Sequence, residues 1–409
     1  MITRHLNEIC FSQDFGRQMR FVAGPRQVGK TTLAKTFLEQ EQLQISRVYY
    51  NWDMRSTRDM FRNDPYFFET FVYDFPDQRQ LWMCFDEIHK MPKWKNILKD
   101  YFDRFEDHCR FIITGSARID WFRRSGDSLA GRYFLFKLFP FSLSELVGDK
   151  PLPMKEEWTA EKFIDLKLSK ISYDADLLEQ LLNFSGFPEP CLKAQSPFHR
   201  RWQRDMADRL VREDIRDLTR IIDVENVATV MSLLPERMGS LLSLNAIRED
   251  VGISYTAVKN CISALQLSYA IFMVPPYSLK IARAIKKEKK CYFCDWTRCR
   301  DESGRFENYV AVELKSMIEQ WNDQGVGDYE LCFVRTKDGK ETNFLIVKDQ
   351  KPWCLFEAKL KDQAIDSHHA RQSKALGDIP LVQICYDNNI LKKAGTKSFR
   401  ISACRFFNS

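Results

Sequence analysis

Hydrophobic residues in the first 150 positions form short runs that alternate with helical spacing. Residues 81–85 are a continuous apolar run, residues 19–23 and 110–114 are nearly so, and residues 32–38 have helical spacing. Uninterrupted apolar runs are typical of parallel strands that are buried on both faces. The pattern therefore predicts an α/β fold with a parallel sheet over residues 1–150.

A change of organisation follows this first domain. Pro151 and Pro153 precede a stretch of alternating charge, and helical apolar spacing then continues to about residue 235. We interpret this region as a helical lid or connector. Further along, a helix, a turn with Ser254 as N-cap and the helix Tyr255–Leu267 precede a strand and a basic hairpin. This order is typical of a winged-helix domain. The predicted domains are residues 1–150, 151–235, 236–300 and 301–409.

Residues 24–31 carry the most specific chemical signal. They read G-P-R-Q-V-G-K-T between a predicted strand and a predicted helix, which is the context that a phosphate-binding loop requires. The backbone N–H groups of such a loop and the N-terminus of the following helix bind phosphate oxygens. We therefore expect ATP as the ligand, with Lys30 between the β- and γ-phosphates and the Thr31 hydroxyl on Mg²⁺. The expected nucleotide-binding residues are Gly24, Pro25, Arg26, Gln27, Val28, Gly29, Lys30, Thr31 and Thr32.

Acidic and hydroxyl residues end the next two predicted strands. Asp86 and Glu87 follow the run 81–85, so we expect Asp86 to hold Mg²⁺ and Glu87 to polarise the attacking water. An ordinary acidic strand end is the alternative. Because a nucleotide that is only sensed does not need the second carboxylate, Glu87 favours hydrolysis. Thr114 or Ser116, after the third strand, is a candidate to sense the γ-phosphate or orient the water; helix capping is the alternative.

Several segments match one known group in order and spacing. They read G-P-R-Q-V-G-K-T-T-L, F-D-E-I-H-K-M-P-K-W, I-I-T-G-S-A-R, A-G-R-Y-F and L-F-P-F-S-L-S-E-L. The chain thereby resembles bacterial and archaeal ATPases of the AAA superfamily that carry a C-terminal domain of unknown function. The resemblance implies a winged helix in the C-terminal half. It also implies that Arg132, otherwise interpreted as a solvated cap, acts as a finger on the nucleotide of a neighbouring subunit, and hence a homo-oligomer.

Positive charge is concentrated in one short segment. The chain has 62 Lys and Arg against 56 Asp and Glu, a net charge of +6. Residues 280–300 carry eight basic residues against Glu288 and Asp295, which is also 8 − 2 = +6. Clustered charge of this kind is expected for contact with phosphate backbones, so double-stranded DNA is a predicted partner. A solvated wing on a protein-binding domain is the alternative. The eight are Lys280, Arg283, Lys286, Lys287, Lys289, Lys290, Arg298 and Arg300.

Residues 305–360 contain a second acidic constellation. Glu307 begins a predicted helix, Asn343 lies in a predicted strand, and Glu357 and Lys359 form E-x-K in the next strand. This arrangement resembles the fold of restriction-type nucleases, in which carboxylates bind Mg²⁺ and the lysine positions water. Asn343 departs from that pattern, which expects Asp, and a neutral amide is a poorer Mg²⁺ ligand. Glu341 is two residues away and would face the same side. We favour a degenerate nuclease fold over an active one.

The remaining features exclude several classes of protein. The N-terminus lacks the features of a signal peptide, and the longest uncharged stretch contains polar residues and a Pro-Pro pair, so we expect a cytoplasmic protein without a membrane span. The twelve cysteines are then expected to be buried free thiols. Cys291, Cys294 and Cys299 are interpreted as structural, because no fourth ligand lies at a suitable distance for zinc. The six histidines show no metal-ligand spacing.

These observations support one leading function and two alternatives. The leading hypothesis is Mg²⁺-dependent ATP binding and hydrolysis that drives a conformational change in a C-terminal half contacting DNA or protein. The first alternative is a nucleotide-gated DNA-binding module with negligible hydrolysis. The second is a Mg²⁺-dependent DNA nuclease regulated by the ATPase.

Overall fold

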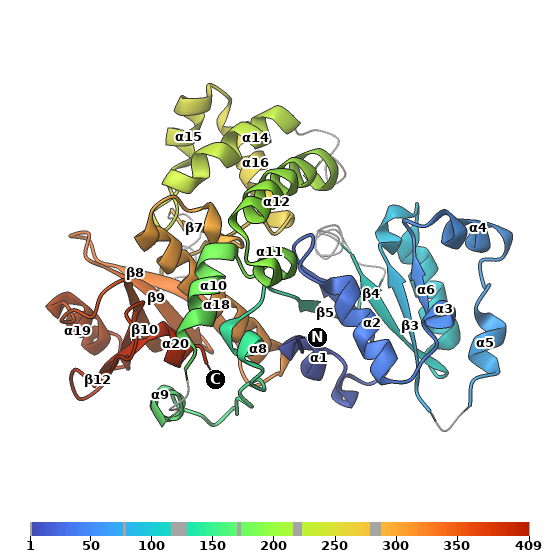
Figure 1. The fold of residues 1–409 in the computed structure, drawn as a ribbon, viewed down its shortest axis with the longest axis horizontal. Helices are drawn as coiled ribbons and strands as arrows, with labels where there is room; N and C mark the ends of the chain where they lie inside the picture. Colours follow the sequence, from blue (N-terminus) through green and yellow to red (C-terminus); the bar gives the residue numbers. More distant parts are fainter. Residues whose placement is uncertain are drawn as a thin grey trace. The chain divides into compact units, whose positions relative to one another are not determined.

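The computed structural model divides the chain into two compact units (Figure 1). The N-terminal unit comprises Leu6–Leu138, and the C-terminal unit comprises Met1–His5 with Phe139–Ser409. The chain therefore passes between the units twice, after residues 5 and 138. The residues that the structure describes are 2–76, 79–115, 129–169, 173–215, 223–278 and 288–408.

A five-stranded parallel sheet forms the centre of the N-terminal unit. Its strand order is β2-β3-β4-β1-β5, so β4 lies between the strand before the phosphate loop and the strand that ends in Asp86. The middle strands are buried along their whole length, as the continuous apolar runs predict. The strands are β1 (Met19–Ala23), β2 (Tyr49–Asn51), β3 (Leu81–Asp86), β4 (Cys109–Thr114) and β5 (Tyr133–Lys137).

Helices flank this sheet (Figure 1). The helix after the phosphate loop buries Leu33, Ala34, Phe37 and Leu38, which are the apolar positions of its helical spacing. The helices of this unit are α1 (His5–Cys10), α2 (Lys30–Gln40), α3 (Ile45–Val48), α4 (Arg55–Asn63), α5 (Glu69–Tyr73) and α6 (Trp94–Phe105), with 3₁₀ turns η1 (Gln13–Phe15) and η2 (Ile88–Lys90).

The C-terminal unit begins with a series of short helices, as predicted for the connector. These are α8 (Leu143–Val147), α9 (Ala160–Ser169), α10 (Ala175–Phe184), α11 (Pro188–Lys193) and α12 (Ser196–Arg209), followed by the π-helical turn η4 (Leu210–Ile215). Ser142 and Glu145 form a capping box at the start of α8.

Three helices and a two-stranded hairpin then share one hydrophobic core. The predicted helix Tyr255–Leu267 is confirmed, and the Ser254 hydroxyl accepts the Ala257 N–H as its N-cap. The antiparallel strands of the hairpin pair Ile271 with Phe293. The elements are α14 (Val224–Leu233), η5 (Leu234–Glu236), α15 (Leu244–Val251), α16 (Tyr255–Leu267), β6 (Ile271–Val274) and β7 (Lys290–Phe293), with η6 (Trp296–Arg298) after it.

A six-stranded mixed sheet, in the order β12-β13-β11-β10-β9-β8, completes this unit. Phe344 and Ile346 belong to the core that contains the long helix α18, whereas Leu345 and Val347 belong to a core under α19. The alternation places the two helices on opposite faces of the sheet. The elements are α18 (Glu302–Asp323), β8 (Tyr329–Arg335), β9 (Glu341–Lys348), β10 (Lys351–Lys359), α19 (Ser367–Ala375), β11 (Leu381–Cys385), β12 (Leu391–Lys393), β13 (Ser398–Ser402) and α20 (Ala403–Phe406).

The cysteines are in the state that the sequence predicts. All twelve cysteines are free and buried. Burial raises the pKa of the Cys294 and Cys299 thiols to about 12. Within the described ranges, none of the helices has the length and apolar character needed to cross a bilayer.

Candidate functional site

The phosphate loop takes the backbone geometry that its glycines allow. Gly24 has φ of +151°, and a Cβ at this position would lie 2.4 Å from the carbonyl oxygen of Leu138. Gly29 has φ of +102° and is the N-cap of α2. Both conformations are open to glycine and strained for other residues. The loop therefore lies close to Leu138, the residue that follows β5, and leads directly into α2. The N–H groups at the N-terminus of such a helix can bind phosphate oxygens.

Lys30 occupies the inside of this loop. Its side chain is 8% exposed, and Nζ donates to the carbonyl oxygens of Gly24, at 2.9 Å, and Pro25, at 2.7 Å. The ammonium is therefore held beside the helix N-terminus by the same loop that would surround a phosphate. Positive charge and oriented N–H groups converge at one place, which is the requirement for binding a polyphosphate.

Asp86, at the end of β3, gathers hydroxyl groups from three other elements. Its Oδ2 accepts hydrogen bonds from Thr31 Oγ1 at 2.8 Å and from Tyr49 OH at 2.5 Å, and its Oδ1 accepts one from Thr114 Oγ1. Asn51 Nδ2 lies 3.4 Å from the same Oδ2. Because β4 lies between β1 and β3, Thr114 reaches Asp86 from the neighbouring strand. Thr31 and Asp86, which were predicted to share Mg²⁺, are thus in direct contact.

Glu87 is held in an unusual backbone conformation directly after Asp86. Its φ is +58°, and its N–H donates to the Thr114 carbonyl at 2.9 Å. Burial raises the pKa of Glu87 to about 7, although the Lys30 charge opposes the rise. His89 Nε2 lies 3.4 Å and Lys90 Nζ 3.7 Å from Glu87 Oε2. A carboxyl group with a pKa near 7 is suited to exchange protons at physiological pH.

The other predicted residues of this site are Thr114, Ser116 and Arg132, and they do not all lie near Asp86. Thr114 lies in the Asp86 network, whereas Ser116 lies outside the described residues. Arg132 immediately precedes β5 and forms a two-point ion pair with Asp103, with Nε–Oδ1 at 2.7 Å. In a parallel sheet, the start of β5 lies at the edge opposite to the ends of β1 and β3. Arg132 is therefore distant, within its own unit, from Lys30 and Asp86.

Two residues of the Asp86 network were not predicted. Tyr49 and Asn51 belong to β2, which has only three residues and follows the four-residue helix α3. Such short elements give no periodic signal in the sequence. The neighbouring Asp86 charge and, above all, burial raise the pKa of Tyr49 well above its usual range, so its hydroxyl stays a donor.

The donor set fits a magnesium nucleotide. Mg²⁺ prefers oxygen ligands and takes few of them from protein when phosphates supply the others. Thr31 and Asp86 offer a hydroxyl and a carboxylate 2.8 Å apart at the edge of the loop. A Cβ on Gly24 would narrow the loop against Leu138, so the close backbone approach that phosphate needs depends on this glycine.

A second cluster of charge lies in the C-terminal unit. Lys290, on β7, is 2% exposed, and its Nζ lies 3.1 Å from Glu307 Oε1 and 2.5 Å from Glu341 Oε1. Tyr292 OH also donates to Glu307, at 2.8 Å. Burial alone would lower the pKa of Lys290, but the two carboxylates outweigh it and raise that pKa. One internal ammonium is thus shared between Glu307, a predicted nuclease residue, and Glu341.

Asn343, Glu357 and Lys359 are brought together as the nuclease-like pattern expects. Glu357 Oε2 accepts the Asn343 N–H at 3.0 Å, and Asn343 Oδ1 accepts the Ala358 N–H at 2.9 Å. Lys359 Nζ pairs with Glu357 Oε1 at 3.0 Å. The Asn343 amide oxygen is thereby used by the backbone of β10. Together with the Lys290 ion pairs, these bonds engage side chains that an active nuclease would present to Mg²⁺.

The structure describes four of the eight basic residues of this segment, namely Lys289, Lys290, Arg298 and Arg300. Residues 280–287 lie outside the described ranges. The prediction that Lys290 contributes to a phosphate-binding surface is wrong, because this side chain is buried between two carboxylates. Arg298 pairs with Asp295 at 3.6 Å and Arg300 with Glu236 at 2.5 Å.

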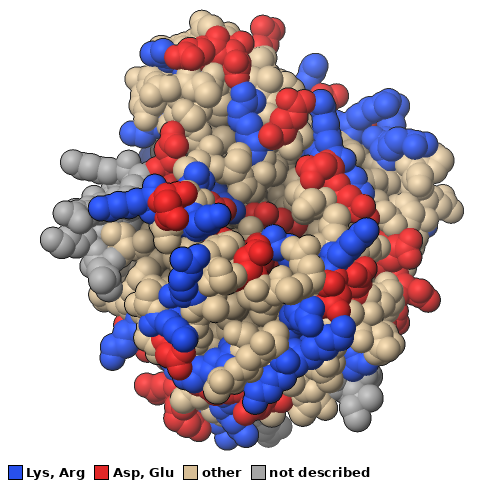
Figure 2. Space-filling model, turned by 90° about the vertical axis from the view of Figure 1, so that its left-hand side faces the viewer, with Lys and Arg blue, Asp and Glu red and all other residues tan. Residues whose placement is uncertain are grey.

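The molecular surface on one side of the C-terminal unit also carries mixed charge. Figure 2 shows the side on which α19 and β12 lie in Figure 1, with basic and acidic side chains interspersed over it. A mixed pattern of this kind is typical of ordinary soluble surfaces and does not by itself indicate nucleic-acid binding.

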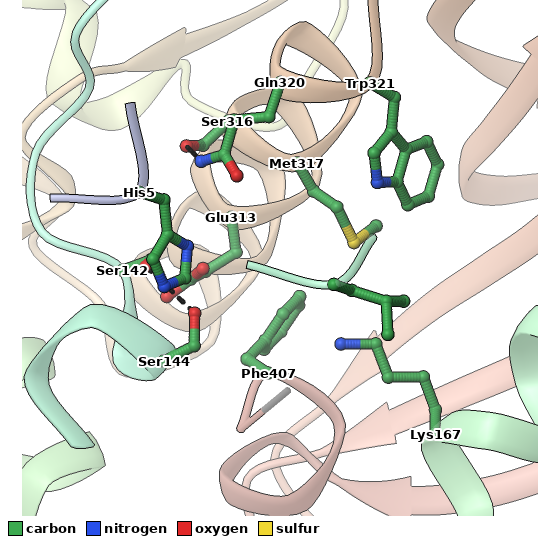
Figure 3. Close-up of a pocket in the computed structure, with 11 residues that line it drawn as sticks. His5, Ser142, Ser144, Lys167, Glu313, Ser316, Met317, Gln320, Trp321 and Phe407 are labelled. Carbon is green, nitrogen blue, oxygen red and sulfur yellow. Dashed lines mark hydrogen bonds between the residues drawn. The ribbon is translucent and has the colours of Figure 1, made fainter. Parts of the chain in front are cut away.

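A small pocket of about 40 Å³ lies in the described part of the C-terminal unit. Figure 3 shows His5, Ser142 and Ser144 beside Glu313, with Lys167 across the pocket. Glu313 Oε1 accepts the Leu143 N–H at 2.8 Å, and burial raises the pKa of Glu313 to about 7. The volume suits a few water molecules and is too small for a nucleotide.

Comparisons with known proteins support the interpretation of the N-terminal unit. Residues 16–147 match a family model described as AAA domain, and residues 175–297 match one described as Domain of unknown function (DUF8612). No curated protein sequence matches the chain.

Two solved structures illustrate the structural likeness. AMPPCP-bound DnaA from Aquifex aeolicus is 13% identical, covers 60% of this chain and 80% of its own, and has a TM-score of 0.28. Cdc6p from Pyrobaculum aerophilum is 12% identical, covers 77% and 93%, and has a TM-score of 0.25. Structural matches with TM-scores this low do not indicate a shared function, so the function is inferred from the geometry of the site. The family match, the phosphate loop and the parallel sheet support an AAA-type P-loop fold for the N-terminal unit.

Proposed function

We propose that the protein binds ATP with Mg²⁺ and hydrolyses it in the N-terminal unit. The observation that carries this proposal is the contact between Thr31 and Asp86, with Glu87 next to it at a raised pKa and Lys30 in the adjoining loop. A fold that only senses nucleotide needs the loop and the metal-binding oxygens. It does not need a second buried carboxyl group that titrates near neutral pH.

Each residue has a defined task in this proposal. The phosphate loop and Lys30 bind and orient the polyphosphate, and Thr31 and Asp86 provide oxygen ligands for the metal ion. When bound, Mg²⁺ neutralises charge on the phosphates. Glu87 positions the attacking water and accepts its proton, while Thr114 holds Asp86 in place through its hydroxyl. Tyr49 fixes the same carboxylate from the other side.

The test separates binding from turnover with two substitutions. Lys30→Ala removes the ammonium from the loop and is expected to abolish ATP binding. Glu87→Gln retains the shape and the hydrogen-bonding capacity but cannot accept a proton, so ATP still binds and turnover falls by about 10²–10⁴-fold. Glu39→Gln, an exposed position on α2, is the matched control and is expected to behave as wild type. Normal turnover by Glu87→Gln would refute the assignment of the base.

We also propose that the ATPase cycle changes the conformation of the C-terminal unit and its contact with a DNA or protein partner. The support is covalent: one connection between the units follows Leu138, whose carbonyl oxygen lies close to Gly24 of the phosphate loop. The three helices α14–α16 with the β6–β7 hairpin follow the winged-helix order. Because Lys290, Arg298 and Arg300 pair with acidic side chains, a DNA contact would depend on Lys289 and on residues 280–287.

A homo-oligomer with Arg132 acting on a neighbour is part of the same proposal. Arg132 lies at the sheet edge opposite to its own phosphate loop, so it has no route to the nucleotide that its own unit binds. Arg132→Ala is expected to retain ATP binding while losing turnover. Mixing it with Lys30→Ala protein tests the trans contribution, since the Lys30→Ala chain supplies an intact arginine. Recovery of turnover supports shared sites, and no recovery contradicts them.

A further inference from the structure

The first turn of α19 and its N-cap residue bring together two histidines and an aspartate that the nucleotide site does not use. One ligand atom from each of Asp366, His368 and His369 lies within 4.8 Å of the other two. The imidazole rings of His368 and His369 are 3.8 Å apart between centroids. Asp366 is the N-cap residue of α19, yet its side chain makes no capping hydrogen bond. Its carboxylate is therefore available to another partner.

Hydrogen bonds fix the tautomer of His369. Thr342 Oγ1 donates to Gln372 Oε1, which has no hydrogen to give, so the same hydroxyl oxygen accepts from His369 Nδ1 at 2.6 Å. The ring proton therefore resides on Nδ1 and the lone pair on Nε2.

His368 is fixed in the complementary way. Its Nε2 lies 3.0 Å from the carbonyl oxygen of Glu341, which can only accept, so Nε2 carries the proton. The other ring nitrogen, Nδ1, is not used by this hydrogen bond. A histidine that donates one ring N–H to a carbonyl or hydroxyl oxygen and turns the other nitrogen elsewhere has the arrangement of a metal ligand.

A carboxylate faces the lone pair of His369. Glu357 Oε1 lies 3.8 Å from His369 Nε2. A carboxylate at this distance favours a cation bound beside the ring nitrogen. Lys359 Nζ reaches the same Oε1 from another direction. Glu307 and Glu341 are paired with Lys290 instead.

We propose that Asp366, His368 and His369 form a binding site for a divalent transition-metal ion such as Zn²⁺, with water as the remaining ligand and the Glu357 carboxylate beside His369. Two imidazoles and a carboxylate are a set that suits zinc-class ions better than Mg²⁺, which prefers oxygen ligands and retains its water. The site is separate from the phosphate loop and lies in the other unit.

The test measures metal uptake directly, with full-length protein stripped by chelator. Equilibrium dialysis against Zn²⁺ with elemental analysis is expected to give one ion per chain. Co²⁺ in its place is expected to give the visible absorption of a four-coordinate nitrogen–oxygen site. Asp366→Asn with His368→Ala changes two residues that are not in a core, and is expected to weaken binding more than the about 10–100-fold typical of a lost outer-shell partner. His108→Ala, an exposed histidine of the other unit, and Lys30→Ala are the controls and are expected to leave binding unchanged.

Two further variants distinguish a metal site from a structural cluster. Thr342→Val removes the hydroxyl that fixes the His369 tautomer and touches no metal, so binding is expected to weaken about 10–100-fold. Lys359→Met removes a positive charge beside Glu357 and is expected to strengthen binding. The proposal is overturned if wild-type protein takes up no Zn²⁺, if the Asp366–His368 double variant binds as wild type, or if Co²⁺ shows an intense near-ultraviolet thiolate band instead.

Discussion

Replacing Lys290 by methionine tests the self-neutralised cluster of the C-terminal unit. The substitution keeps most of the apolar stem of the side chain and removes only the ammonium, which is 2% exposed and bridges Glu307 and Glu341. Two carboxylates would then face each other without their shared cation. Losing one partner of a buried ion pair costs about 3–5 kcal/mol, because the remaining charge is left uncompensated.

The surroundings place the expected loss at the lower end of that range. Glu341 retains a second partner, Arg335, whose Nη1 lies 3.3 Å from its Oε2, and Glu307 retains the Tyr292 hydroxyl. We therefore expect Lys290→Met to reduce the free energy of unfolding by about 3 kcal/mol, with a fall in melting temperature of roughly 6–12 °C. Lys289→Met, one residue earlier and outside this cluster, is the control and is expected to change stability by less than about 0.5 kcal/mol.

Differential scanning calorimetry of the full chain measures this effect. ADP is expected to raise the melting temperature of the N-terminal unit, which binds it. The effect of Lys290→Met is therefore expected in the unfolding transition whose melting temperature does not change with ADP. Adding Glu307→Gln and Glu341→Gln to Lys290→Met removes the unpaired charges and is expected to recover most of the loss. A Lys290→Met protein as stable as wild type, or a triple variant as unstable as the single one, would refute the ion-pair reasoning.

Three further substitutions or titrations follow from the same geometry. The pKa of Glu313 is 4.5 in the unfolded chain and about 7 in the folded one, so the free energy of unfolding falls by about 3 kcal/mol as the pH rises between these values. In urea titrations, Glu313→Gln should make the free energy of unfolding less dependent on pH. Gly24→Ala places a Cβ 2.4 Å from the Leu138 carbonyl and should weaken ATP binding at least tenfold by calorimetry; unchanged affinity would contradict the loop geometry. The turnover rate should rise with pH through about 7 as Glu87 loses its proton, and a flat profile from pH 6 to 8 would exclude Glu87 as the base.

The phosphate loop and the Asp86–Glu87 pair could be predicted because their signals are local. Each consists of a short motif between elements with clear periodicity, and the parallel sheet then brings strand ends together without further information. Thr114 was found by the same logic. Tyr49 was missed because β2 is too short to show a pattern, and only the completed sheet places it next to Asp86.

Lys290 shows why charge clusters in a sequence mislead. Its neighbours along the chain are basic, which predicted a phosphate-binding surface, but β7 buries it beside carboxylates that lie 17 and 51 positions further along. His368 and His369 are adjacent and gave no metal-ligand spacing. Their partners Thr342 and Glu357 come from two other strands, so the arrangement exists only after the sheet and α19 pack.

The central claim is that this chain hydrolyses ATP with the residues of its N-terminal unit. The most direct measurement is steady-state ATP hydrolysis by wild-type protein with Mg²⁺, with and without duplex DNA, and with Glu87→Gln protein as the blank. We predict turnover by wild type that exceeds the Glu87→Gln blank by about 10²–10⁴-fold. Stimulation by DNA would assign the partner of the C-terminal unit to nucleic acid, and indifference to DNA would assign it to protein. Wild-type turnover no higher than the Glu87→Gln blank would contradict the claim.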